Sequence, residues 1–200
     1  MRVLAIIGAL AIVVAIGAAV YFFGGFYSVA GTVEDPAVVH WALVKVRTVS
    51  IERHATDQPP AKFGEPAMVQ AGAREYAEHG CTTCHGGPGV KWAKFSEGLH
   101  PDPPDLKEVV GGATPSQLFW VIKNGINMTG MPSFGAVGVS DEDIWEIVAF
   151  LKQLPKVSEA DYKAWTAPAP PAAPAAAPPA AAPPAAAPPA APAPPAEPPK

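Results

Sequence analysis

Cys81-Thr82-Thr83-Cys84-His85 is the most informative segment of this 200-residue chain. Two cysteines three residues apart lie about one helical turn apart, which suits the two vinyl groups on one edge of a porphyrin. A histidine directly after the second cysteine then falls beneath the ring, with its imidazole aimed at the iron. The segment therefore predicts covalent attachment of one haem through Cys81 and Cys84, with His85 as an axial ligand of the iron.

Other uses of the two cysteines are less well supported. A structural zinc site needs four ligands, usually from two such pairs, and the chain has only these two cysteines. A thioredoxin-like thiol pair is expected within a βαβ pattern, which the surrounding sequence lacks. A plain disulfide would not require His85. A thiol–disulfide protein that uses Cys81 and Cys84 stays open as an alternative.

A haem iron usually takes a second axial ligand, and seven side chains are candidates. They are Met68, Met128, Met131, His40, His54, His79 and His100. Met131 is favoured because Gly130 lets the backbone approach closely and Pro132 stiffens the loop, so that a constrained segment presents the thioether. Met128 stays open as a competing ligand, and His100 as the main bis-histidine alternative. A methionine that only fills a gap in the core would explain the residue equally simply.

The residues from Glu65 to Tyr162, about half of the chain, resemble the small monohaem cytochromes c of the His/Met type. The resemblance rests on Gly72-Ala73-Arg74-Glu75-Tyr76, Cys81–Gly86, Asn124-Gly125-Ile126, Thr129-Gly130-Met131-Pro132 and Ile144–Leu151. It implies an all-α fold around one covalent haem c, with His85 proximal and Met131 distal. It also implies one-electron transfer rather than catalysis.

The helical pattern of the same residues supports this fold class. Met68 to Glu78 has the pattern of a helix and runs into the cysteine motif. Thr114-Pro115-Ser116-Gln117 predicts a capping box at a helix start, and Gly125 stands where the C-terminal cap belongs. Ser140 to Asp143 starts the last predicted helix in the same way, and Pro155 ends it.

Two further contacts are expected from the resemblance. The first and last helices should cross at a glycine–aromatic contact, for which the matching residues are Gly72, Tyr76, Ile147 and Phe150. A ligating histidine normally donates its second ring N–H to an acceptor. The resemblance suggests a proline carbonyl, and Pro103 or Pro104 is the candidate.

Val3 to Phe23 forms an apolar run without a charged residue, which spans roughly 30 Å as a helix, the thickness of a bilayer's hydrocarbon core. Arg2 precedes the run and two acidic residues follow it, so the positive-inside rule predicts a cytoplasmic N-terminus. We expect a single-pass anchor in the lipid of a bacterial cytoplasmic membrane, with the haem domain on the periplasmic side. The alternative is a cleaved signal peptide ending at Ser28-Val29-Ala30, although its apolar core would be shorter.

The chain is therefore expected to have four parts. A transmembrane anchor occupies residues 1–30, an amphipathic helical connector 31–65, the cytochrome c-like haem domain 66–166 and a disordered Pro/Ala-rich tail 167–200. In the connector, Asp35 is expected to cap a helix that begins at Pro36 and ends near His54. In the tail, Ala-Ala-Ala-Pro-Pro repeats from 175 to 189, and its prolines exclude a helix.

The expected function is that of a membrane-tethered one-electron carrier. It would shuttle electrons between respiratory or photosynthetic redox partners, or act as the cytochrome subunit of a membrane oxidoreductase. A haem with both axial ligands from the protein has no open position, so we expect no small-molecule substrate and no catalytic residue. The alternative is a haem-based sensor in which Met131 dissociates to admit a small ligand. The net charge of −4 argues against a nucleic-acid partner.

Overall fold

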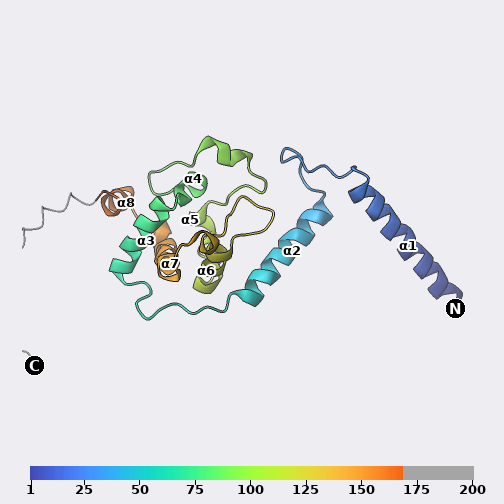
Figure 1. Cartoon of the computed structure of the whole chain (residues 1–200), viewed down its shortest axis with the longest axis horizontal. Helices are drawn as coiled ribbons and strands as arrows, with labels where there is room; N and C mark the ends of the chain where they lie inside the picture. Colours follow the sequence, from blue (N-terminus) through green and yellow to red (C-terminus); the bar gives the residue numbers. More distant parts are fainter. Residues whose placement is uncertain (169–200) are drawn as a thin grey trace, which may run out of the picture. The chain divides into compact units, whose positions relative to one another are not determined.

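The structure is a computed structural model that describes residues 1–168, and in this range it is helical without a strand (Figure 1). The α-helices are α1 (Arg2–Phe23), α2 (Ala37–His54), α3 (Pro66–Glu78), α4 (Cys81–His85), α5 (Leu106–Val109), α6 (Pro115–Asn124), α7 (Asp141–Gln153) and α8 (Glu159–Trp165). Three 3₁₀ turns lie between them, η1 (Lys94–Gly98), η2 (Gly135–Val137) and η3 (Leu154–Lys156). The all-α class is confirmed, while nearly all of the predicted tail lies outside the described residues.

The crossing of α3 and α7 forms the centre of the fold. A Cβ atom at Gly72 would lie 1.8 Å from the carbonyl oxygen of Glu146 and 3.0 Å from the nitrogen of Ile147, so only glycine permits this approach. One turn further along α3, the ring of Tyr76 packs on that of Phe150 with centroids 5.3 Å apart. The helix contact expected from the resemblance is confirmed.

The core lies between α3, α6 and α7. Phe119 of α6 stacks on Trp145 of α7 with centroids 4.2 Å apart, and Ile144 and Val148 are inaccessible to solvent. Burial of an aliphatic or aromatic side chain of this size stabilises the fold by about 1.5–3 kcal/mol. Seven apolar residues of α7 are buried, so this helix is covered by its neighbours on most of its sides.

The ends of α6 and α7 carry the caps that the sequence predicts. Thr114 Oγ1 accepts from the nitrogen of Gln117 at 3.2 Å, and Gln117 Oε1 accepts from the nitrogen of Thr114 at 2.8 Å. Ser140 and Asp143 form the same capping box at the start of α7. α6 ends at Gly125, whose φ of 69° is a conformation that favours glycine.

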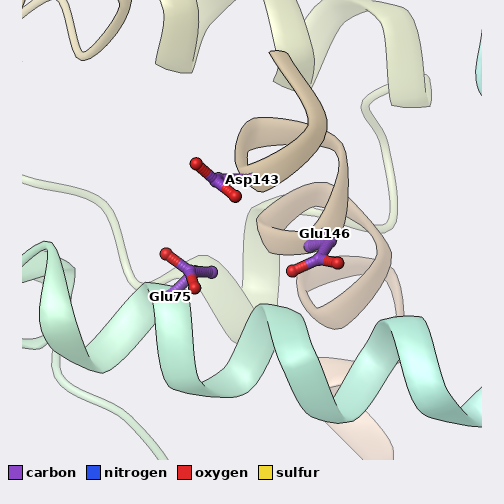
Figure 2. A group of neighbouring side chains, drawn as sticks. All are labelled: Glu75, Asp143 and Glu146. Carbon is purple, nitrogen blue, oxygen red and sulfur yellow. The ribbon is translucent and has the colours of Figure 1, made fainter. Parts of the chain in front are cut away.

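Three carboxylates gather where α3 and α7 meet. Figure 2 shows Glu75 on α3 opposite Asp143 and Glu146 on α7, and their ligating oxygens lie within 4.8 Å of one another. Burial raises the pKa of Glu146, and the charges of Glu75 and Asp143 raise it further. Asp143 already has a structural role in the capping box. The three carboxylates therefore lie together because α3 and α7 cross at this point, and no bound cation is needed to explain the cluster.

α1 is a 22-residue helix that is long and apolar enough to cross a membrane, by length and composition, and none of its residues is buried. Residues 24–36 join it to α2, and within them the hydroxyl of Tyr27 donates to Asp35.

α2 differs from its prediction in two ways, although it ends at His54 as expected. It begins at Ala37 with Pro36, rather than Asp35, at the N-cap position and without a side-chain cap, and Asp35 accepts a hydrogen bond from Tyr27. The prediction of an amphipathic helix is also wrong. None of its residues is buried, and at 100° per residue Val38, Leu43 and Val44 point in three different directions.

Candidate functional site

The predicted haem-attachment residues form a helix of their own, α4, between two glycines. Gly80 and Gly86 flank it with φ of 72° and 64°, so the chain turns sharply at both ends. Cys81 and Cys84 are both half-buried and are not joined by a disulfide. The two sulfur atoms and the imidazole of His85 therefore come from one short rigid turn.

His85 is held by the loop that precedes α5. Its Nδ1 lies 3.0 Å from the carbonyl oxygen of Pro104. Because a carbonyl only accepts, Nδ1 carries the proton, and the lone pair of Nε2 is available to a metal. The predicted proline carbonyl is confirmed, with Pro104 rather than Pro103 as the acceptor.

Two more hydrogen bonds fix α4 against its neighbours. The hydroxyl of Tyr76, on α3, donates to the carbonyl oxygen of Gly86 at 2.8 Å, and Tyr76 is buried. The nitrogen of Ala93 donates to the carbonyl oxygen of Thr83 at 2.8 Å. Each such bond contributes about 1 kcal/mol. Together they position the imidazole of His85 from the side of α3 and from the loop that follows.

The protonation of the cysteines bears on the thiol–disulfide alternative. The pKa of the Cys81 thiol is raised to about 12, mainly by burial and to a smaller extent by the charge of Cys84. Redox-active cysteines instead have a lowered pKa, because the thiolate is the nucleophile. A half-buried Cys81 with a raised pKa thus lacks the property that thiol–disulfide exchange requires.

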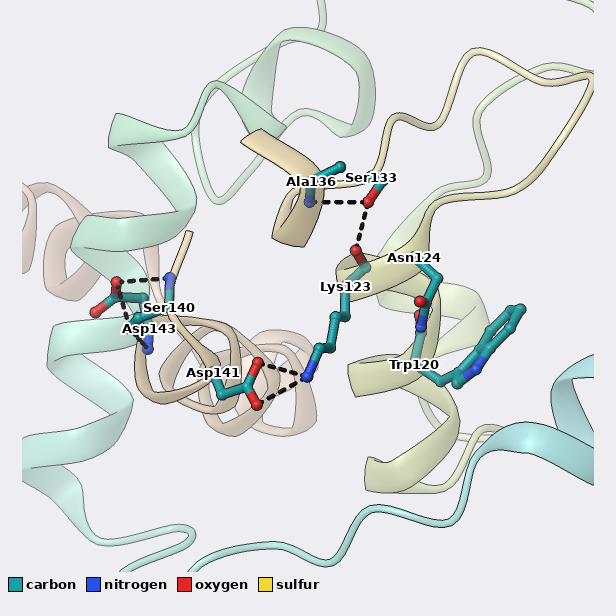
Figure 3. Close-up of polar contacts among 8 residues, drawn as sticks. All are labelled: Trp120, Lys123, Asn124, Ser133, Ala136, Ser140, Asp141 and Asp143. Atoms are coloured by element: carbon teal, nitrogen blue, oxygen red, sulfur yellow. Dashed lines mark hydrogen bonds and ion pairs between the residues drawn. The ribbon is translucent and has the colours of Figure 1, made fainter. Parts of the chain in front are cut away.

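Met131 lies in the loop between α6 and η2, and this loop is tied to α6 at both ends. Figure 3 shows the hydroxyl of Ser133 donating to the carbonyl oxygen of Lys123 at 2.7 Å, and the nitrogen of Ala136 donating to the hydroxyl of Ser133 at 3.1 Å. Lys123 also pairs with Asp141 of α7 at 2.7 Å. The loop is therefore anchored to α6, which is itself paired with α7.

Within this loop, short-range contacts fix the backbone of Met131. Its nitrogen donates to the hydroxyl of Thr129 at 3.1 Å, and its carbonyl oxygen accepts from the nitrogen of Ile126 at 3.2 Å. A Cβ atom at Gly125 would lie 2.8 Å from the same carbonyl oxygen. The half-buried side chain of Met131 packs against the core cluster that Cys81 also touches.

The loop after α4 meets the loop that carries Met131. A Cβ atom at Gly130 would lie 2.9 Å from Cδ1 of Leu99, so the glycine is needed for this contact. The structure thus brings together two segments that are about 30 residues apart in the sequence. Sequence reasoning assigned Gly130 to a close backbone approach, but it did not identify Leu99 as the neighbour.

The other candidate ligands lie in different surroundings. Met128 is 80% exposed and has a positive φ, so its thioether points into solvent rather than into the core. His100 is exposed, and His54 stacks on Trp120 with ring centroids 6.0 Å apart. His79 Nε2 lies 3.1 Å from a carboxylate oxygen of Glu75.

The donor set fits a covalently held haem. Two unbridged cysteines, an imidazole with a free Nε2 and a half-buried thioether are the groups that such a haem uses. A pocket of about 180 Å³ adjoins Cys84, and its lining includes Trp92 and Pro104. A larger pocket of about 610 Å³ lies at the start of α3 and α7, away from the cysteines, and neither pocket is lined by His85 or Met131.

One side of the site is formed by residues to which the sequence analysis gave no role. α8 follows α7, and its Tyr162 is buried against α3 and the turn after His85. The spacing of Ser158 and Asp161, which form a helix cap, is the signal that would have indicated this helix.

Comparison with known proteins identifies the segment that contains this site. Residues 67–151 match the family model described as cytochrome C oxidase, cbb3-type, subunit III. No curated protein and no solved structure matches the chain significantly. The matched segment begins in α3 and ends in α7, so it includes α4 and the loop of Met131 but not α8.

Proposed function

We propose that this chain is a membrane-tethered one-electron carrier with a single covalent haem c, because residues 67–151 match a family model of a cytochrome oxidase subunit and contain the cysteine motif. The observation that carries the proposal is the hydrogen bond from His85 Nδ1 to Pro104, in a segment that also presents Cys81 and Cys84. It supports His85 as a ligand because it fixes the tautomer and orients the ring.

Each site residue then has a distinct role. The sulfur atoms of Cys81 and Cys84 form thioether bonds to the two vinyl groups, which fixes the haem to α4. Nε2 of His85 and the thioether of Met131 would hold the iron. The haem supplies a single iron that alternates between the ferric and ferrous states. A thioether ligand and burial both favour the ferrous state, so the carrier has a relatively high reduction potential.

Met131 is proposed over Met128 on the basis of burial. Met131 packs against the core and its backbone is fixed on both sides, whereas the side chain of Met128 is 80% exposed. A ligand held by a rigid loop stays bound in both oxidation states, which lowers the reorganisation that accompanies electron transfer. A dissociable ligand, as in a sensor, would be expected on a loop with fewer anchors.

The organisation of the whole chain follows from the same proposal. Residues 1–30 anchor the protein in a bacterial cytoplasmic membrane, residues 31–65 connect the anchor to the haem domain of residues 66–166, and residues 167–200 are the Pro/Ala-rich segment of the sequence. The charge of Arg2 before α1, and of Glu34 and Asp35 after it, favours a haem domain on the periplasmic side. This is also the compartment in which bacteria attach haem c.

The partner is proposed to be a membrane oxidoreductase. The matched family is described as a subunit of a cytochrome oxidase, which supports a role as the cytochrome subunit of such a complex. A carrier that shuttles between separate respiratory or photosynthetic complexes is the other form of the proposal. Purification from mild-detergent extracts separates the two, because a subunit elutes with its complex and a shuttle elutes alone.

The ligand assignment is tested by comparing the absorption spectra of Met131→Ala and Met128→Ala with that of the unsubstituted holoprotein. A pyridine haemochrome spectrum first establishes covalent haem. We expect the weak red band of Met-to-iron ligation in the oxidised unsubstituted protein and in Met128→Ala, and its loss in Met131→Ala. If carbon monoxide binds the unsubstituted reduced protein readily, the sensor is favoured over the carrier. If Met128→Ala loses the band instead, the assignment of Met131 is wrong.

A further inference from the structure

Residues 93–99 form a short segment that follows α4 and contains η1, and its first residue is tied to the haem-attachment helix. The nitrogen of Ala93 donates to the carbonyl oxygen of Thr83, in α4, at 2.8 Å. Just before the segment, the ring of Trp92 lies against the turn that follows α4, because a Cβ atom at Gly86 would lie 3.4 Å from Cε3 of this ring. α4 therefore sets the position of the start of the segment.

The segment is held rigid by hydrogen bonds around Ser96, which is 2% exposed. The hydroxyl of Ser96 donates to the carbonyl oxygen of Ala93 at 2.7 Å, and the nitrogen of Ser96 donates to the same oxygen at 3.0 Å. The nitrogen of Leu99 then donates to the carbonyl oxygen of Ser96 at 3.2 Å. Unwinding this turn would leave the buried hydroxyl without a partner, which costs free energy. Leu99 is therefore presented at a fixed position relative to α4.

The side chain of Leu99 packs on the backbone of the residue that precedes Met131, in the loop between α6 and η2, which we call the methionine loop. A Cβ atom at Gly130 would lie 2.9 Å from Cδ1 and 3.2 Å from Cδ2 of Leu99, so the end of the leucine lies directly over this glycine. Leu99 is half-buried, whereas Gly98 and His100 on either side of it are exposed. Leu99 is thus the residue through which the segment reaches the methionine loop.

Hydrogen bonds support the methionine loop from the side of α6. The hydroxyl of Ser133 donates to the carbonyl oxygen of Lys123, in α6, and the carbonyl oxygen of Met131 accepts from the nitrogen of Ile126 within the loop. Among residues 1–168, no hydrogen bond joins the methionine loop to residues 93–99. The contact between them is therefore apolar, and it supports the loop from the segment that is tied to α4.

We propose, on the basis of the proposed function, that Leu99 is a positioning residue for Met131. Its contact with Gly130 makes residues 93–99 a rigid link between the helix that carries His85 and the loop that carries Met131. The link keeps the thioether of Met131 within reach of the iron and makes its detachment rare. An external ligand binds only to the fraction of molecules in which Met131 is detached, so this fraction sets the apparent affinity for such a ligand.

The test measures the binding of carbon monoxide to the ferrous full-length holoprotein in Leu99→Ala and Leu99→Ile. Leu99→Ala removes the side chain that packs on Gly130, so the fraction of molecules with a detached Met131 increases. We expect the apparent affinity for carbon monoxide to rise by about tenfold, which corresponds to about 1.4 kcal/mol, and the weak red band of the oxidised protein to decrease. Leu99→Ile keeps an apolar side chain of the same volume, so it should bind carbon monoxide as weakly as the unsubstituted protein.

Two further variants separate this contact from a general loss of stability. Leu154→Ala removes a leucine of η3 that is 2% exposed, so it should lower the unfolding midpoint at least as much as Leu99→Ala while the affinity for carbon monoxide stays unchanged. Gly130→Ala adds a Cβ atom that presses on Leu99 and should by itself raise the affinity. In the Leu99→Ala background it should not raise the affinity further, because the effects of two residues in contact do not add.

Three results would overturn the inference while leaving the proposed function intact. The first is an affinity for carbon monoxide in Leu99→Ala equal to that of the unsubstituted protein. The second is an equal rise in Leu154→Ala, which would assign the effect to the stability of the whole domain. The third is strict additivity of Gly130→Ala and Leu99→Ala, which would show that their contact does not matter. If the unsubstituted protein carries no covalent haem or already binds carbon monoxide readily, the proposed function fails, and the inference fails with it.

Discussion

At Gly72, the absence of a side chain sets the distance between α3 and α7. We expect Gly72→Ala to destabilise the protein by about 3 kcal/mol or more, at the upper end of the cost of overpacking, because its Cβ would overlap the backbone of Glu146. The two backbone segments that would clash belong to the core helices α3 and α7, so neither can move without a large loss of packing. The measurement is the free energy of unfolding in denaturant.

Gly111→Ala is the matched control for this substitution. A Cβ atom at Gly111 would have no neighbour within 4 Å, and its φ is not positive. We expect a change within about 0.5 kcal/mol, as is usual for exposed positions. Equal stability of Gly72→Ala and Gly111→Ala would show that the crossing of α3 and α7 is looser than the structure has it.

At the scale of residues, the sequence identifies those whose neighbours are close along the chain. The cysteine motif and the capping residue Thr114 need only local geometry. Pro104 and Gly72 were expected because the resemblance supplied their distant partners. For Tyr162 and Leu99, neither a motif nor the resemblance indicated a contact partner. Each contacts a segment far away in the sequence, and neither belongs to a motif with a recognisable spacing.

At the scale of helices, Glu146 gives the contact of α3 and α7 a pH dependence. Its pKa is raised in the folded protein by burial and by the charges of Glu75 and Asp143. A carboxyl whose pKa is higher in the folded than in the unfolded state binds its proton more tightly when folded. Its contribution is therefore destabilising at pH values above the folded pKa, and it disappears below the usual pKa of glutamate.

We accordingly expect Glu146→Gln to raise the free energy of unfolding at pH 7 by a few tenths of a kcal/mol, about the size of an exposed charge interaction. The gain should vanish at pH 4 and shrink with added salt. The measurement is denaturant unfolding at both pH values, with Glu108→Gln of the exposed helix α5 as the control. A gain that persists at pH 4 would trace the effect to packing rather than to charge.

The bounds of a helix could be predicted from the sequence where capping residues indicate its ends. α6 and α7 begin at capping boxes and were located well. α2 was located at Ala37–His54, although its apolar residues do not lie on one face as an amphipathic helix requires. α8 was missed because seven residues are too few to establish a period, although Ser158 and Asp161 have the spacing of a helix cap.

At the scale of the whole molecule, α1 determines whether the protein is attached to a membrane, and the haem domain is expected to fold and bind haem without it. We expect the full-length chain to stay with membranes after an alkaline carbonate wash, because α1 alone is long enough to span the bilayer. A variant in which a cleavable export signal replaces residues 2–23 should appear in the soluble periplasmic fraction with the same haem spectrum. Cell fractionation followed by haem staining measures both properties.

An unrelated transmembrane helix in place of α1 is the control, and it should restore the chain to the membrane fraction. If the variant without α1 remains in the pellet, another part of the protein or a tightly bound partner holds it there. Loss of the haem spectrum in that variant would instead mean that α1 contributes to the haem domain, contrary to its complete exposure.

The segment between α1 and the haem domain limits where electrons can be delivered. Residues 24–36, fully extended, and the helix α2 span together at most about 70 Å, and the far end of α2 is docked by the stacking of His54 on Trp120. A domain confined to this layer finds its partners by lateral diffusion. The frequency of encounter is then set by the number of partner complexes per area of membrane, and dilution of the surrounding aqueous compartment leaves it unchanged.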